Sequence, residues 1–103
     1  MPRSKTPVLI WSTAARADLI RLRQFIEPYN PEAARNAAQT LKNAANLILQ
    51  HSGIGKRLEG RQDRELFIPF GRRGYIIRYR IEENAIIVQK IWHGLEDRTR
   101  SSD

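Results

Sequence analysis

The sequence predicts an α+β domain in which an antiparallel helical hairpin packs on one face of a small, mostly antiparallel β-sheet, in the order β-α-α-β-β-β. Two observations lead to this prediction. In the first half of the chain, apolar residues recur at helical spacing in two segments joined by a short connection. In the second half, apolar and polar residues alternate in short runs separated by turn residues. Packing the two layers together lets each bury its apolar side.

The length and composition place limits on the protein. Its 103 residues are enough for one domain with its own core, and we expect that domain to span residues 1–103, with loose ends at about 1–7 and 99–103. Cysteine is absent and the two histidines stand apart, so we expect neither a metal nor a cofactor. No apolar run is long enough for a signal peptide or a membrane span, which predicts a cytoplasmic protein.

The chain is strongly basic, with eighteen Lys and Arg residues against eleven Asp and Glu residues and a net charge of +7. An excess of this size favours an anionic partner, either nucleic acid or an acidic protein. The alternative is that the charge serves solubility alone. The local excess lies between residues 56 and 80, where the basic residues are Lys56, Arg57, Arg61, Arg64, Arg72, Arg73, Arg78 and Arg80.

The first elements are a short strand and a helix. Val8-Leu9-Ile10-Trp11 is an apolar run of strand length, and Ser12 after it can cap a helix by accepting an amide hydrogen bond. Apolar residues then recur three or four positions apart, which predicts one buried stripe. The stripe consists of Ala15, Leu19, Leu22, Ile26 and Tyr29, and the charged residues Arg16, Asp18, Arg21 and Arg23 are expected mostly off it.

A second helix follows at once. Asn30 is a good cap, Pro31 is tolerated at a first helical position, and Glu32 complements the helix dipole. The apolar face of this helix is mostly alanine, so it can approach a neighbour closely. The short connection makes the two helices an antiparallel hairpin. Gly53 suits a left-handed helix cap, and residues 53–63 read as a loop.

Three strands complete the chain. The inward positions are expected to be Leu66, Ile68 and Phe70 in the first strand and Tyr75, Ile77, Tyr79 and Ile81 in the second. Residues 71–74 and 82–84 form the turns. Arg78 and Arg80 then lie on the opposite face, where each needs solvent or an acidic partner. The third run, residues 85–92, is apolar in both registers at its start, so the pattern does not determine its buried face.

Several short motifs follow one another from residue 8 to residue 98. They are Trp11 with residues 14–17 and Asp18-Leu19, Asn30-Pro31-Glu32-Ala33-Ala34, Gly53-Ile54-Gly55, Arg64-Glu65-Leu66, Tyr75-Ile76-Ile77-Arg78-Tyr79-Arg80, and Ile91-Trp92-His93-Gly94 with Asp97. In this order and spacing they resemble the RelE/ParE superfamily of toxins from bacterial type II toxin–antitoxin pairs. The resemblance implies the same fold and a hetero-oligomer with a cognate antitoxin, whose extended or helical arm neutralises the toxin.

The superfamily has two branches with different targets. RelE-like members cleave messenger RNA on the ribosome with basic sheet residues and a C-terminal tyrosine, and ParE-like members poison DNA gyrase. Here Ile76 and Gly71 stand where the RelE branch has arginines, and residues 99–103 include no tyrosine. These departures favour a ParE-like toxin that inhibits gyrase by binding, without catalysing a reaction. The alternatives are a ribosome-dependent mRNA endonuclease and a non-toxic basic nucleic-acid-binding module.

The candidate site residues follow from these interpretations. For binding to the target or to the antitoxin they are Arg64, Arg72, Arg73, Arg78, Arg80, Trp92 and Arg98. For a nuclease they are His93, Arg72, Arg73 and Arg98, with His93 acting as acid or base near neutral pH. The structural alternatives are that His93 only caps a strand end and that Tyr75 and Tyr79 are core aromatics with hydroxyls at the margin.

The sheet itself suggests where the antitoxin binds. A sheet covered by helices on one side leaves its other face open, with Phe67, Ile76 and part of the last strand beside Arg78 and Arg80. We expect an acidic, amphipathic antitoxin segment on that face. Trp11 is expected either to pack in the core or to face the antitoxin.

Overall fold

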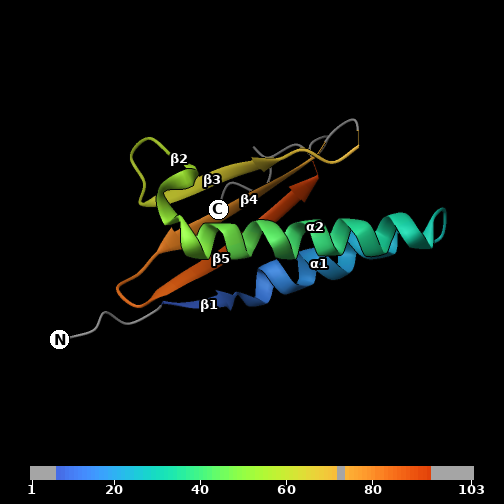
Figure 1. Ribbon diagram of the computed structural model, residues 1–103, viewed down its shortest axis with the longest axis horizontal. Coiled ribbons are helices and arrows are strands. Elements are labelled where there is room, and N and C mark those ends of the chain that lie inside the picture. Colours follow the sequence, from blue (N-terminus) through green and yellow to red (C-terminus); the bar gives the residue numbers. More distant parts are fainter. Residues whose placement is uncertain (1–6, 72–73, 94–103) are drawn as a thin grey trace.

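The protein has two layers (Figure 1), and the computed structural model describes residues 7–71 and 74–93. One layer is a five-stranded sheet of order β1-β5-β4-β3-β2, and the other is a hairpin of two helices that covers one face of the sheet. The elements are β1 (Val8–Trp11), α1 (Thr13–Ile26), α2 (Pro31–Gln50), a short 3₁₀ helix (Ser52–Ile54), β2 (Lys56–Arg57), β3 (Asp63–Ile68), β4 (Tyr75–Ile81) and β5 (Ala85–His93).

This architecture confirms the predicted α+β class and the predicted order of elements. The structure adds β2, a strand of two residues inside the segment expected to be a loop, which pairs with the start of β3. Apart from residue 7, the ends expected to be loose lie outside the described residues. None of the described helices combines the length and the apolar character needed to cross a membrane.

Helix α1 begins as predicted and ends earlier than predicted. The Ser12 hydroxyl accepts a hydrogen bond from the Ala15 amide at 3.0 Å, which is the expected cap. Ala15 and Leu22 are buried, and Leu19 and Ile26 pack against the core. The placement of Tyr29 on the buried stripe was wrong. The helix ends at Ile26, so Tyr29 lies in the turn before α2 and is 86% exposed.

Helix α2 is antiparallel to α1 and begins at its predicted cap (Figure 1). The Asn30 side chain accepts a hydrogen bond from the Ala33 amide at 3.0 Å, and Pro31 is the first helical residue. The buried face consists of Ala34, Ala37, Leu41, Ala44, Ala45 and Ile48. The left-handed conformation expected of Gly53 was wrong, because the chain passes from α2 into the 3₁₀ helix and Gly53 keeps a negative φ.

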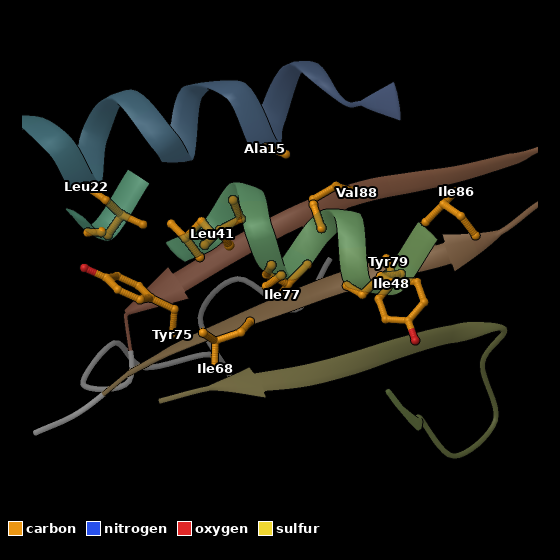
Figure 2. Packing of buried hydrophobic residues seen from close by; sticks show 14 residues of the cluster. Ala15, Leu22, Leu41, Ile48, Ile68, Tyr75, Ile77, Tyr79, Ile86 and Val88 are labelled. Atoms are coloured by element: carbon orange, nitrogen blue, oxygen red, sulfur yellow. The ribbon is translucent and has the colours of Figure 1, made fainter. Parts of the chain in front are cut away.

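Strands β3, β4 and β5 form the predicted antiparallel meander, and β1 joins the edge of β5 in parallel. The side chains that fill the space between sheet and helices are shown in Figure 2. From the sheet they are Ile68, Tyr75, Ile77, Tyr79, Ile86, Val88 and Ile91. Ile81, expected to share this burial, is 40% exposed at the end of β4.

An extra residue in β5 explains why its buried face was not evident from the sequence. Arg78 pairs with Lys90 and Tyr79 pairs with Val88, so Gln89 has no partner on β4 and forms a β-bulge. The bulge shifts the alternation by one residue. Ile86 and Val88 before it, and Ile91 after it, therefore all face the helices.

Candidate functional site

The sheet surface that the helices leave uncovered is the predicted binding face, and we call it the open face. Strand register places on it every residue that pairs across the sheet with Ile76, Arg78 or Arg80. Its members are Asp63, Glu65 and Phe67 of β3, Ile76, Arg78 and Arg80 of β4, and Ile87, Lys90 and Trp92 of β5. Phe67 is 56% exposed, so part of this face is apolar and accessible.

Arg78 lies at the centre of the open face and is held on two sides. Its Nε and Nη2 atoms donate hydrogen bonds to Glu65 Oε2 at 3.0 and 2.8 Å. Its guanidinium carbon lies 4.8 Å from the centroid of the Trp92 ring, close enough for a cation–π interaction. Both charged side chains of this pair are only 11% exposed. The acidic partner expected for Arg78 is therefore present within the chain itself.

Arg80 is paired in the same way with a buried carboxylate. Its Nε donates to Asp63 Oδ1 at 3.1 Å, and Arg61 donates to Oδ2 of the same group. The Asp63 side chain is fully buried, and two cations offset the cost of removing its charge from water. The Arg80 side chain remains 43% exposed. It can still contact a partner, and because Arg61 shares the same carboxylate, the three side chains together keep a net charge of +1.

Arg64 lies on the opposite, helix-covered side of the sheet, because it pairs across strands with buried Tyr79. Its Nη1 donates to the Gly55 carbonyl at 2.8 Å. The Tyr79 hydroxyl accepts from the Gly55 amide at 2.8 Å and donates to the Ser52 carbonyl at 2.7 Å. Arg64 and Tyr79 thus hold the segment that follows α2. Burial raises the pKa of Tyr79, and the Gly55 hydrogen bond and the Arg64 charge oppose that rise.

The end of β5 brings two further candidates together. Trp92 is 2% exposed, and no acceptor among the described residues lies within reach of its indole N–H. The His93 ring meets the Tyr75 ring edge-on, with centroids 5.5 Å apart. Tyr75 is buried, and burial raises the pKa of its hydroxyl, so it stays protonated at neutral pH. The three other predicted residues, Arg72, Arg73 and Arg98, lie outside the described residues.

A groove on the helix side of β1 was not predicted as a unit. It has a volume of about 410 Å³, and its apolar lining comes from Leu9, Trp11 and Leu19. Arg16 of α1, and Lys42 and Asn46 of α2, complete the lining. None of the described lining residues is a carboxylate, and the ion pairs between described residues involve neither of the two cations of the groove. Trp11 is half-buried here and packs against the core, which agrees with the packing alternative predicted for it.

The sequence interpretation missed two buried carboxylates. Asp63 gives no clear signal in the sequence, because its burial depends on strand register. Asp18 does give one: it lies three residues after Ala15 and four before Leu22, on the buried stripe of α1. Placing it off that stripe was wrong. Within residues 7–71 and 74–93, no group of three or more His, Asp or Glu side chains is arranged to hold a metal ion.

Comparison with known proteins gives consistent relationships. Toxin RelE3 of Caulobacter vibrioides is 37% identical over 84 residues, which cover 82% of this chain and 90% of that protein. Toxin RelE1 of the same organism is 34% identical over 93 residues, or 90% of this chain and 99% of that protein.

The fold has a counterpart in a solved structure described as the chromosomal ParDE TA system from P. aeruginosa. One of its chains matches with a TM-score of 0.75 and 24% identity, covering 87% of this chain and 98% of that chain. The family model of the ParE toxin of the type II toxin–antitoxin system parDE matches residues 9–98. This chain therefore belongs to the ParE toxin family of type II toxin–antitoxin systems, within the wider RelE/ParE group.

Proposed function

We propose that this toxin arrests growth by binding DNA gyrase, without catalysing a reaction itself. The observation that supports this proposal is that the arginines of the open face already form ion pairs within the chain. Arg78 and Arg80 are each paired with a carboxylate of the same chain, whereas RNA cleavage needs cations available to a charged phosphorane. The buried tyrosines, with raised pKa values, are poor proton acceptors at neutral pH. An accessible apolar and basic surface suits binding instead.

The test compares two activities of the purified toxin: inhibition of gyrase supercoiling and cleavage of mRNA on ribosomes. We expect the first and not the second. Reversing the charges of Arg72 and Arg73, or truncating the chain after Gly94, should weaken gyrase inhibition through affinity, by about tenfold per 1.4 kcal/mol lost. Ribosomal cleavage without any effect on gyrase would contradict the proposal. Nucleic-acid binding without growth arrest would indicate the non-toxic module.

A second candidate function is ribosome-dependent mRNA cleavage, and the position of His93 favours it. This residue ends β5 beside Tyr75, and an imidazole is a common general acid or base in catalysis. For a nuclease, His93→Ala should slow cleavage by about 100-fold or more while ribosome binding is retained. For a gyrase-binding toxin the same change should matter little. His51→Ala, which removes the other, exposed histidine, is the matched control.

The toxin is held inactive by a cognate antitoxin, and we place an acidic, amphipathic segment of that partner in the groove beside β1. On the open face, the charges expected to attract such a segment are already paired. In the groove, Arg16 and Lys42 lie beside an apolar lining, and no carboxylate from the described part of the chain lines it with them. An acidic helix with one apolar face matches this arrangement of charge and apolar surface.

The placement is tested with Lys42→Glu, which should lower affinity for the co-encoded antitoxin by about tenfold or more and reduce the association rate. Arg35→Glu makes the same charge change on α2, at an exposed residue that does not line the groove. It should leave antitoxin binding within about threefold of wild type. Equal losses in both variants would show that only net charge matters and would rule out the groove.

A further inference from the structure

The two ends of strand β5 are supported differently along its outer edge. Strand β1 pairs only with the first four residues of β5, Ala85 to Val88. Beyond that point the chain has left the sheet to form α1, so within residues 7–71 and 74–93 no strand pairs with the outer edge of β5 from Gln89 onward. A sheet edge leaves backbone N–H and C=O groups without a ladder partner, and such groups are costly when buried.

Side chains of α1 and its cap take the place of the missing strand. The Ser12 hydroxyl donates to the Gln89 carbonyl at 3.0 Å. The buried Asp18 carboxylate accepts the Ile91 amide hydrogen through Oδ2 at 2.8 Å. Arg21 Nη2 lies 3.3 Å from the Ile91 carbonyl and 3.4 Å from Asp18 Oδ1. Both backbone groups of Ile91 are thus bonded to one carboxylate–guanidinium pair from the neighbouring helix.

We infer that Asp18 and Arg21 are positioning residues that fix the C-terminal half of β5, and thereby orient Trp92 and His93 for the action of the toxin. Ile91 directly precedes Trp92 and lies two residues before His93, so its backbone position sets where both side chains start. Lys90 Nζ also lies 3.5 Å from Asp18 Oδ1 and 6.0 Å from the Trp92 ring centroid. The carboxylate therefore contacts β5 through both the Ile91 amide and the Lys90 side chain.

The inference has a structural part and a functional part, and only the functional part rests on the proposed function. A hydrogen bond from a backbone amide to a buried carboxylate is stronger than one to a neutral acceptor. Removing Asp18 leaves the Ile91 amide buried without this acceptor, so the end of β5 should open more often. Toxicity should fall because the end of β5, which carries Trp92, is displaced, and not because the whole domain unfolds.

The experiment compares Asp18→Ala and Asp18→Asn with the wild-type toxin, using Glu27→Ala as a control that removes a carboxylate from the exposed end of α1. Three quantities are measured: hydrogen exchange of the Ile91 amide, the NMR shifts of the Trp92 indole and the His93 ring, and growth arrest. In Asp18→Ala we expect Ile91 to exchange at least about tenfold faster relative to core amides. Both ring signals should shift. Asp18→Asn keeps an acceptor of the same shape and should show a smaller increase in exchange.

A change at Ile48, far from this edge and fully buried, separates positioning from stability. Ile48→Val, or a larger truncation chosen to match the stability of Asp18→Ala, should keep wild-type ring shifts and toxicity at temperatures where both variants are folded. Equal loss of toxicity in the two variants, or Ile91 exchange in Asp18→Ala within about twofold of wild type, would overturn the inference. If the wild-type toxin affects neither gyrase nor the ribosome, the proposed function fails, while the exchange and shift measurements still decide the role of Asp18.

Discussion

The two faces of strand β4 differ completely although their residues alternate along one short segment. Tyr75, Ile77 and Tyr79 point into the core and are almost fully buried. On the other face, Arg78 and Arg80 pair with carboxylates from β3. The covered face depends on apolar contact, which is insensitive to salt, whereas the open face depends on charge pairs, which salt screens where they are exposed. The fold therefore places its apolar core on one side of the sheet and pairs of charged side chains on the other.

The largest expected effect compares two neighbouring residues of β4. Ile77→Ala removes a fully buried side chain from the covered face and should lower the free energy of unfolding by about 2–5 kcal/mol. Ile76→Ala, one residue away on the half-buried open face, should cost about 1 kcal/mol or less. Denaturant unfolding of both variants measures the difference. Similar losses in the two would mean that the open face is packed as tightly as the core.

A second comparison concerns two glycines of residues 52–55, the segment that Tyr79 holds against the covered face. Gly55 has an ordinary extended backbone, but a Cβ there would lie 2.7 Å from the Tyr79 ring and hydroxyl. Gly55→Ala should therefore destabilise the fold by about 1–3 kcal/mol through steric overlap. Gly53→Ala meets nothing within 4 Å and should change the melting temperature little. Adding Tyr79→Phe should not rescue Gly55→Ala, because the ring carbon at 2.7 Å from the added Cβ remains and the hydrogen bonds of the Tyr79 hydroxyl to Gly55 and Ser52 are lost.

The charge pairs of the open face can be ranked by a double-mutant cycle. Glu65 and Arg78 are mostly shielded from water, so their coupling energy should be about 1–2 kcal/mol. The Arg23–Glu27 pair on α1, at 3.7 Å and about half exposed, should give no more than about 0.5 kcal/mol. Adding salt should reduce the second value proportionally more. Equal coupling energies in the two pairs would show that the open face does not shield its ion pair from solvent.

The smallest effect we expect is loss of stability at high pH, and it arises from the covered face. Burial raises the pKa of Tyr75 and Tyr79 above the ordinary value near 10. Above pH 10 the two tyrosines lose their protons in the unfolded chain before they do in the folded chain. Stability therefore falls as the pH rises through the range between the unfolded and the folded pKa values. Unfolding should become easier over that range, and Tyr75→Phe should reduce the dependence. A flat profile in the wild-type protein would contradict the raised pKa values.

Local patterns were sufficient to predict most of the fold. Helix periodicity, the caps Ser12 and Asn30, and the alternation in β4 each depend on residues close in sequence, and they were confirmed except at Asp18, Tyr29 and Ile81. The exceptions have local causes too. Strand β2 has only two residues, too few for a pattern, and Tyr29 continued the apolar spacing of α1 after the helix itself had ended.

The candidate site was less accessible to sequence reasoning because its interactions join distant segments. Alternation placed Arg78 and Arg80 on one face, but their carboxylate partners follow only from the register between β3 and β4. The same register sends Arg64 to the other side, where it holds a loop. Asp18 was misplaced for a different reason. The stripe of α1 was defined by its apolar residues alone, although Asp18 lies at the same helical spacing as Ala15 and Leu22.

The bulge at Gln89 has a consequence for how chains of different length can share this fold. If Gln89 were deleted, Val88 would still pair with Tyr79 and Lys90 with Arg78, and every side chain of β5 would keep its face. Deleting Gln89 would remove the hydrogen bond between its carbonyl and the Ser12 hydroxyl, but it would leave the pairing of β5 with β4 intact. A one-residue gap at Gln89 in an alignment of related toxins is therefore compatible with the same strand pairing. A gap two positions away in either direction would move the residues beyond the gap to the opposite face of the sheet.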